Sequence, residues 1–181
     1  MDPTGVSSEV ELDDNKLILL AILYLYTRPM DRSKKSGIFI KEYALFAIIH
    51  YLILKKVLDY DYASRLKLWK GGSYAFVNIS QEAIADLDYL INCSLVNKIR
   101  FSTRDHIYTI GYGITKMAIK MLDEKYRDIV EKVRAHLFVN GVLKKLVVED
   151  DDAYLVYGEN KEPIGCLRTE DVSYISDPDF M

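Results

Sequence analysis

The stretch that decides the fold reads, from Ile79 to Leu137, ISQEAIADLDYLINCSLVNKIRFSTRDHIYTIGYGITKMAIKMLDEKYRDIVEKVRAHL. Ser80 is a residue type that caps helix N-termini, and apolar residues follow it at the three- and four-residue spacing of a helix. That spacing predicts a short helix with one face in the core, formed by Ala83, Ile84, Leu87, Leu90 and Ile91. The opposite face carries Gln81, Glu82, Ala85, Asp86, Tyr89 and Asn92.

The apolar pattern changes after Leu95-Val96 from helical spacing to alternation. Ile99 and Phe101 precede the polar segment 102–105, and Ile107 and Ile110 follow it, which predicts two short strands joined by a polar tip. Thr115 is a second candidate N-cap, and the apolar stripe after it runs for about six turns, through Ala118, Leu122, Ile129, Val133 and Leu137. A stripe of this length predicts a partner helix.

A short helix, a hairpin and a longer helix follow one another in the order of a winged helix. The stretch resembles the winged helix-turn-helix regulators of the MarR and PadR type, and the resemblance covers about a third of the chain. It implies a winged-helix fold and a dimeric, DNA-binding transcription regulator. The residues that carry it are Leu90, Ile91, Ser94, Leu95 and Val96, then Arg100, Arg104 and Tyr108, then Ile114, Thr115 and Ala118. Ser94 and Ala118 stand where those families have glycine.

Composition bounds the organisation of the chain. Its 181 residues, half of them apolar, are enough for one sizeable core and an appendage. The formal charge is −4 over residues 1–27, +9 over residues 28–145 and −8 over residues 146–181. We expect an α+β, mainly helical fold with a flexible acidic leader (1–12), a winged-helix domain with dimerisation helices (13–138) and a small acidic β-rich appendage (139–181).

Two apolar runs, 17–26 and 43–54, are shorter than the roughly twenty residues that a membrane-spanning helix needs. They predict buried helices over about 13–27 and 38–59. No secretion signal opens the chain, and two cysteines make no disulfide framework, so we expect a cytoplasmic protein without membrane contact. The wide apolar surfaces of the 38–59 and 115–137 helices favour a homodimer.

The segment 59–74 has two open interpretations. Arg65, Lys67 and Lys70 alternate with Tyr62, Trp69 and Tyr74, a pattern typical of contact with a phosphate backbone. The alternative is that the apolar residues of the segment pack in the core while the lysines stay in water.

No catalytic motif occurs in the sequence. His50, His106 and His136 lack motif partners, and Asp150-Asp151-Asp152 lacks the glycine and the closing glutamate of a calcium loop. We therefore expect neither an enzyme nor a bound cofactor or metal.

Two functions remain, of which we favour the first and keep the second as the alternative. In the first, the protein is a DNA-binding regulator that contacts double-stranded DNA through three elements. The predicted hairpin, or wing, would use Lys98, Arg100, Arg104 and His106, and the 80–92 helix would use Gln81, Tyr89 and Asn92. The 59–74 segment would add Arg65, Lys67 and Lys70. Glu82, Asp86 and Asp88 oppose this hypothesis because carboxylates repel phosphates. In the second, the winged helix is a protein-protein interaction module, either an adaptor or an assembly subunit, whose acidic helix face docks a partner protein.

Overall fold

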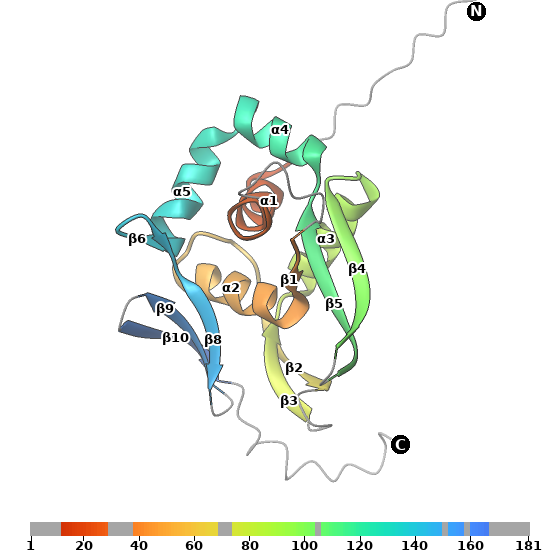
Figure 1. Cartoon of the computed structure of the whole chain (residues 1–181), viewed down its shortest axis with the longest axis vertical. Coiled ribbons are helices and arrows are strands. Elements are labelled where there is room, and N and C mark those ends of the chain that lie inside the picture. The colour runs from red at the N-terminus through yellow and green to blue at the C-terminus, as the bar shows by residue number, and fades with distance from the viewer. Residues whose placement is uncertain are drawn as a thin grey trace, which may run out of the picture.

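The computed structural model describes residues 12–28, 38–68, 74–103, 106–149, 152–157 and 160–166. The chain is α+β, with five helices and small antiparallel sheets within this part (Figure 1). The helices are α1 (Asp14–Thr27), α2 (Glu42–Leu54), α3 (Gln81–Asn92), α4 (Lys116–Lys125) and α5 (Arg127–Leu137). The strands are β1 (Ile40–Lys41), β2 (Ala63–Leu68), β3 (Tyr74–Ile79), β4 (Val96–Thr103), β5 (His106–Ile114), β6 (Phe138–Val139), β7 (Val142–Leu143), β8 (Lys145–Glu149), β9 (Asp152–Tyr157) and β10 (Asn160–Cys166).

Helix α1 lies at the centre of the molecule, where Figure 1 shows it end-on. It contacts α3, α4, α5 and strand β5, so that its residues from Leu17 to Tyr24 are all buried. The apolar run predicted to form a buried helix does so. None of the helices in the described part of the chain is long and apolar enough to cross a bilayer.

The predicted hairpin after α3 is confirmed as β4 and β5, which pair antiparallel from Val96↔Ile114 to Phe101↔Thr109. Strand β1 joins the other edge of β5 through Ile40↔Tyr112, giving the sheet order β1-β5-β4. This two-residue strand, just before α2, is thereby held against β5, the strand that leads into α4.

The two predicted N-caps, Ser80 and Thr115, are confirmed, and Asp13 caps α1 in the same way. Asp13 accepts a hydrogen bond from the N–H of Lys16, Ser80 from that of Ala83 and Thr115 from that of Ala118. Each cap satisfies a backbone donor that the first helical turn leaves without an intrahelical partner. These polar residues therefore fix where α1, α3 and α4 begin.

The helix predicted over 38–59 is shorter in the structure. Its first residues instead lead into β1, and α2 begins only at Glu42. It ends at Leu54, and Lys56 just beyond it adopts φ +56 while the N–H of Val57 bonds to the carbonyl of Leu52. Such a left-handed residue closes a helix because it turns the chain away from the helix axis.

The single helix predicted over 115–137 is also wrong. Tyr126 has φ −132 and ψ 36, outside helical values, and it separates α4 from α5. The bend allows both helices to contact α1, and Ala118, Leu122, Val130 and Val133 are buried there. The partner of the long apolar stripe is thus α1 of the same chain. Helix α2 is likewise covered within the chain, by β1, β3, β5 and β10, whereas Leu54 at its end and Met117 of α4 are more than half exposed.

The segment 59–74 contributes strand β2, which forms an antiparallel hairpin with β3, and β3 contacts α2. After α5, Asn140 and Gly141 form a two-residue turn between β6 and β7, with φ +50 and +78. This is the positive-φ pair that a type I′ hairpin turn requires.

The predicted β-rich segment near the C-terminus forms the sheet β10-β9-β8, and β10 contacts α2. Buried Lys144 joins it to the helices, because its Nζ donates to the Tyr51 hydroxyl at 3.1 Å and its N–H donates to the Leu137 carbonyl at 2.8 Å. The rest of the predicted appendage, residues 167–181, lies outside the described residues.

Candidate interaction face around helix α3

Helix α3 presents a polar face to solvent. Ala83, Leu87 and Leu90 are buried and anchor it, as the spacing predicts. Three of the residues predicted to read DNA, Gln81, Tyr89 and Asn92, are exposed on the opposite side. The sequence therefore predicted the orientation of this helix correctly.

The three carboxylates of α3 all have partners in the rest of the chain. Glu82 accepts a hydrogen bond from the N–H of Asp61 at 2.8 Å. Asp86 accepts one from the Tyr60 hydroxyl at 2.6 Å and forms an ion pair with Lys16 at 3.1 Å. Asp88 and Lys98 of β4 lie 3.5 Å apart. These contacts attach α3 to the loop before β2, to α1 and to β4.

Two further acidic segments are held next to the start of α3. The side chain of Asn15, in the first turn of α1, exchanges two hydrogen bonds with the backbone of Asp59, at 3.1 and 3.2 Å. Lys16 bridges Asp13 and Asp86. The result is a set of carboxylates from three parts of the chain, which we call the acidic face: Asp13, Asp59, Asp61, Glu82 and Asp86.

The electrostatics of the acidic face favour positive charge. Hydrogen bonding to Asp13 raises the pKa of Lys16, and its contact with Asp86 adds to this, although burial works in the opposite direction. Burial and the neighbouring Asp86, Asp13 and Glu82 raise the pKa of the Tyr60 hydroxyl, because each disfavours a phenolate. Lys16 is thus the single cation among five carboxylates.

Tyr89 supplies an exposed aromatic ring beside the acidic face. The ring is 38% exposed, and the Lys16 ammonium lies 5.4 Å from its centre. An exposed tyrosine next to carboxylates can receive both the apolar stem and the charged head of a lysine or arginine.

The cations predicted to contact DNA are only partly placed by the structure. Lys98 is engaged by Asp88 and lies 5.7 Å from the centre of the Tyr112 ring. Arg100 is exposed on β4. Arg65 and Lys67 lie in β2 and His106 begins β5, whereas Lys70 and Arg104 lie outside the described residues.

Sequence reasoning missed Asp13, Lys16, Asp59 and Asp61 as members of this site. The hydrogen bonds that gather them span separations of 44 and 21 residues, which no local spacing reveals. The charge segregation of the sequence gives no signal either, because four of the five carboxylates lie within residues 28–145, the segment with a net charge of +9.

Among the described residues, no group of three or more histidines, cysteines and acids could hold a metal ion. His50 is buried, with its ring centre 4.6 Å from that of Tyr62 in an edge-to-face arrangement.

The chain matches a known protein family over most of its length. One family model matches residues 15–162, from the first turn of α1 into β10. No curated protein and no solved structure matches the chain significantly.

Proposed function

The chain belongs to the Uncharacterized protein MJ1567 family, and we propose that this member is a winged-helix protein-protein interaction module. Its acidic face and Tyr89 bind a lysine- or arginine-rich segment of a partner protein. The observation that carries the proposal is the gathering of five acidic residues, from three parts of the chain, around the N-terminal half of α3.

The order of elements supports the winged-helix assignment. Helix α1, strand β1, helices α2 and α3 and the β4–β5 hairpin follow one another, with the β2–β3 hairpin inserted between α2 and α3. Strand β1 pairs with β5, the second strand of that hairpin, in the sheet order β1-β5-β4. The resemblance to MarR- and PadR-type regulators gains support from Ser94, which has φ +59 where those families carry glycine.

Electrostatics favour a protein partner over DNA at α3. A recognition helix enters the major groove with its N-terminal residues toward the base edges. Here the N-terminal half of α3 carries Glu82 and Asp86, and Asp59 and Asp61 lie beside it. A carboxylate about 4 Å from a phosphate costs about 1 kcal/mol even in bulk water, and several of them would act together.

A basic partner fits the same groups. Its cations would pair with Asp59 and Asp61, whose side chains are exposed, while Tyr89 packs against an apolar stem. Tyrosine is enriched at the centres of protein interfaces, where it contributes contact area and one hydrogen bond.

DNA binding is a second candidate, with contacts made by the hairpins and not by α3. Lys98 and Arg100 lie on β4, Arg65 and Lys67 lie on β2, and both hairpins extend toward the same end of the molecule in Figure 1. Phosphate contacts from two hairpins would give binding that depends on salt and little on sequence.

The two candidates are separated by fluorescence anisotropy with two probes, a labelled lysine-rich peptide and a labelled duplex of random sequence. The double variant Asp59→Asn/Asp61→Asn removes two charges from the acidic face and leaves its hydrogen bonds to other described residues in place, because those bonds use only the backbone of Asp59 and Asp61. We expect its affinity for the peptide to fall by a factor of about 2 to 30, as for two exposed ion pairs.

The matched control is Glu124→Gln/Asp128→Asn, which makes the same charge change on α4 and α5. Peptide binding that is equally weak in both double variants would contradict the use of the acidic face. Duplex binding that falls steeply with salt and is weakened by Lys98→Ala/Arg100→Ala would favour the second candidate, especially if the peptide does not bind.

A further inference from the structure

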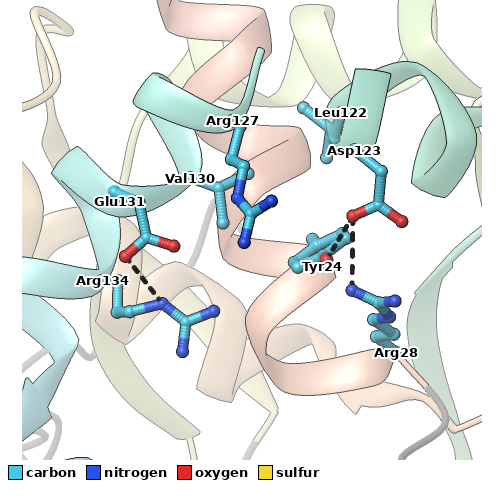
Figure 2. Close-up of a pocket in the computed structure, with 8 residues that line it drawn as sticks. All are labelled: Tyr24, Arg28, Leu122, Asp123, Arg127, Val130, Glu131 and Arg134. Carbon is cyan, nitrogen blue, oxygen red and sulfur yellow. Dashed lines mark hydrogen bonds and ion pairs between the residues drawn. The ribbon is translucent and has the colours of Figure 1, made fainter. Parts of the chain in front are cut away.

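We propose that a pocket between α1, α4 and α5 is a binding site for a small organic carboxylate. The pocket is separate from the acidic face, and the inference does not depend on the proposed function. Its volume is about 310 Å³, and Figure 2 shows three arginines and two acids around it. Leu122 and Val130, both buried, form apolar parts of its lining.

One side of the pocket is a pre-formed polar cluster at the end of α1. Asp123 of α4 accepts a hydrogen bond from the Tyr24 hydroxyl at 2.6 Å and one from Arg28 at 3.3 Å. The Arg28 guanidinium also lies over the Tyr24 ring, 4.7 Å from its centre. Arg28 and Asp123 therefore hold each other in place and neutralise each other.

The other side is formed by α5, where Arg134 and Glu131 lie one turn apart. The Nε of Arg134 is 3.2 Å from a Glu131 oxygen, which is close enough for an ion pair. That Nε is buried, yet its N–H makes no hydrogen bond of normal geometry. A buried donor in this state gains from an acceptor that approaches along its N–H direction.

Arg127, the first residue of α5, is left with an uncompensated charge. The two acids of the pocket are paired with Arg28 and Arg134, whereas Arg127 forms no ion pair or hydrogen bond within the described residues. Figure 2 shows its guanidinium directed into the space between those two pairs. The pocket thus carries one net positive charge, located at a group that binds oxyanions through two parallel N–H donors.

The charge balance selects the class of ligand. A monocarboxylate would neutralise Arg127, whereas a phosphate monoester, at a charge of about −1.5 to −2 near pH 7, would leave an excess of negative charge beside Asp123 and Glu131. The apolar lining and the Tyr24 ring favour a ligand with an apolar body attached to the carboxylate.

The test is a titration of the full chain with benzoate, followed by isothermal calorimetry and by ¹⁵N NMR of the arginine Nε–Hε groups. We expect saturable binding and a shift of the Arg127 and Arg134 signals. Arg127→Gln should weaken binding by about 5-fold or more, because it removes a charge-assisted pair of hydrogen bonds. Lys132→Gln, the same charge change on another side of α5, should leave the affinity unchanged.

Arg134→Gln is a second test of the pocket, should Arg127→Gln alter the fold. Benzamide and inorganic phosphate are the reference probes. Equal affinity for benzamide and benzoate would overturn the role of the charge, and tighter binding of phosphate would overturn the carboxylate class. No saturable benzoate binding, or equal losses in Arg127→Gln and Lys132→Gln, would overturn the site.

Discussion

The side chain of Thr27 joins the last turn of α1 to the end of strand β5 at Ile114. Its hydroxyl accepts a hydrogen bond from the Ile114 N–H at 3.0 Å and donates one to the Leu23 carbonyl at 2.7 Å. Thr27 is buried, so water cannot replace either bond. One hydroxyl therefore satisfies a buried backbone donor and fixes the central helix against the sheet.

Thr27→Val should lower the free energy of unfolding by about 1–3 kcal/mol, the cost of leaving a buried N–H without an acceptor. The shape of the side chain is retained, so packing changes little. Urea denaturation measures the loss. Thr27→Ser keeps the hydroxyl and should retain more stability than Thr27→Val; equal stability of the two variants would contradict the role of this bond.

Ser94→Gly should raise the stability. Ser94 ends α3 at φ +59, and the N–H of Leu95 bonds back to the Leu90 carbonyl, as in a helix that closes with a left-handed residue. A residue with a side chain is destabilised by about 1 kcal/mol in that conformation, and glycine avoids this cost. Part of the gain is offset because glycine loses more backbone entropy on folding. We expect a gain of up to about 1 kcal/mol in thermal or urea unfolding.

The matched control for Ser94→Gly is Ala85→Gly, in the exposed interior of the same helix. Glycine there should lower the stability by about 1 kcal/mol, because it costs backbone entropy without relieving a strained φ. The same residue type should thus act with opposite signs nine positions apart. A loss in both variants would refute the prediction for Ser94.

His136 should make the protein less stable in mild acid. Burial and the nearby Lys144, Lys55 and Lys132 lower the pKa of His136 below its ordinary value of 6.5. The unfolded chain therefore binds this proton more readily than the folded chain. The stability that comes from keeping His136 neutral is fully present above pH 6.5, and it is lost as the pH falls toward the pKa of His136 in the folded chain.

Urea unfolding of the protein and of His136→Gln, compared between about pH 8 and pH 5, measures this contribution. The stability of the wild type relative to the variant should fall as the pH drops. A difference that does not change with pH, or that grows in acid, would show that His136 is not the titrating group.

The elements predicted correctly from the sequence are those that depend on interactions between residues close together in the chain. Ser80 and Thr115 mark the starts of two helices, because each satisfies a donor three residues away. The alternation on either side of the polar segment 102–105 likewise predicted β4 and β5. These features need no knowledge of the rest of the chain.

The errors arose where contacts distant in the sequence override the local pattern. The apolar stripe continues across Tyr126, so periodicity alone gives one helix, whereas packing on α1 favours two. Ile40 belongs to a strand because Tyr112 lies opposite it. The acidic face depends on the hydrogen bonds between Asn15 and Asp59. The pocket between α1, α4 and α5 depends on contact of the end of α1 with α4 and α5.

The burial of α1 has a consequence for hydrogen exchange. Leu19, Leu20, Ala21, Ile22 and Leu23 have no solvent-accessible surface, and elements from four other parts of the chain surround them. An amide in such a helix cannot exchange by fraying or by the release of one neighbouring element. Deuterium should therefore enter the middle of α1 only when the whole domain opens, and the slowest exchange rates in the molecule will report its global free energy of unfolding.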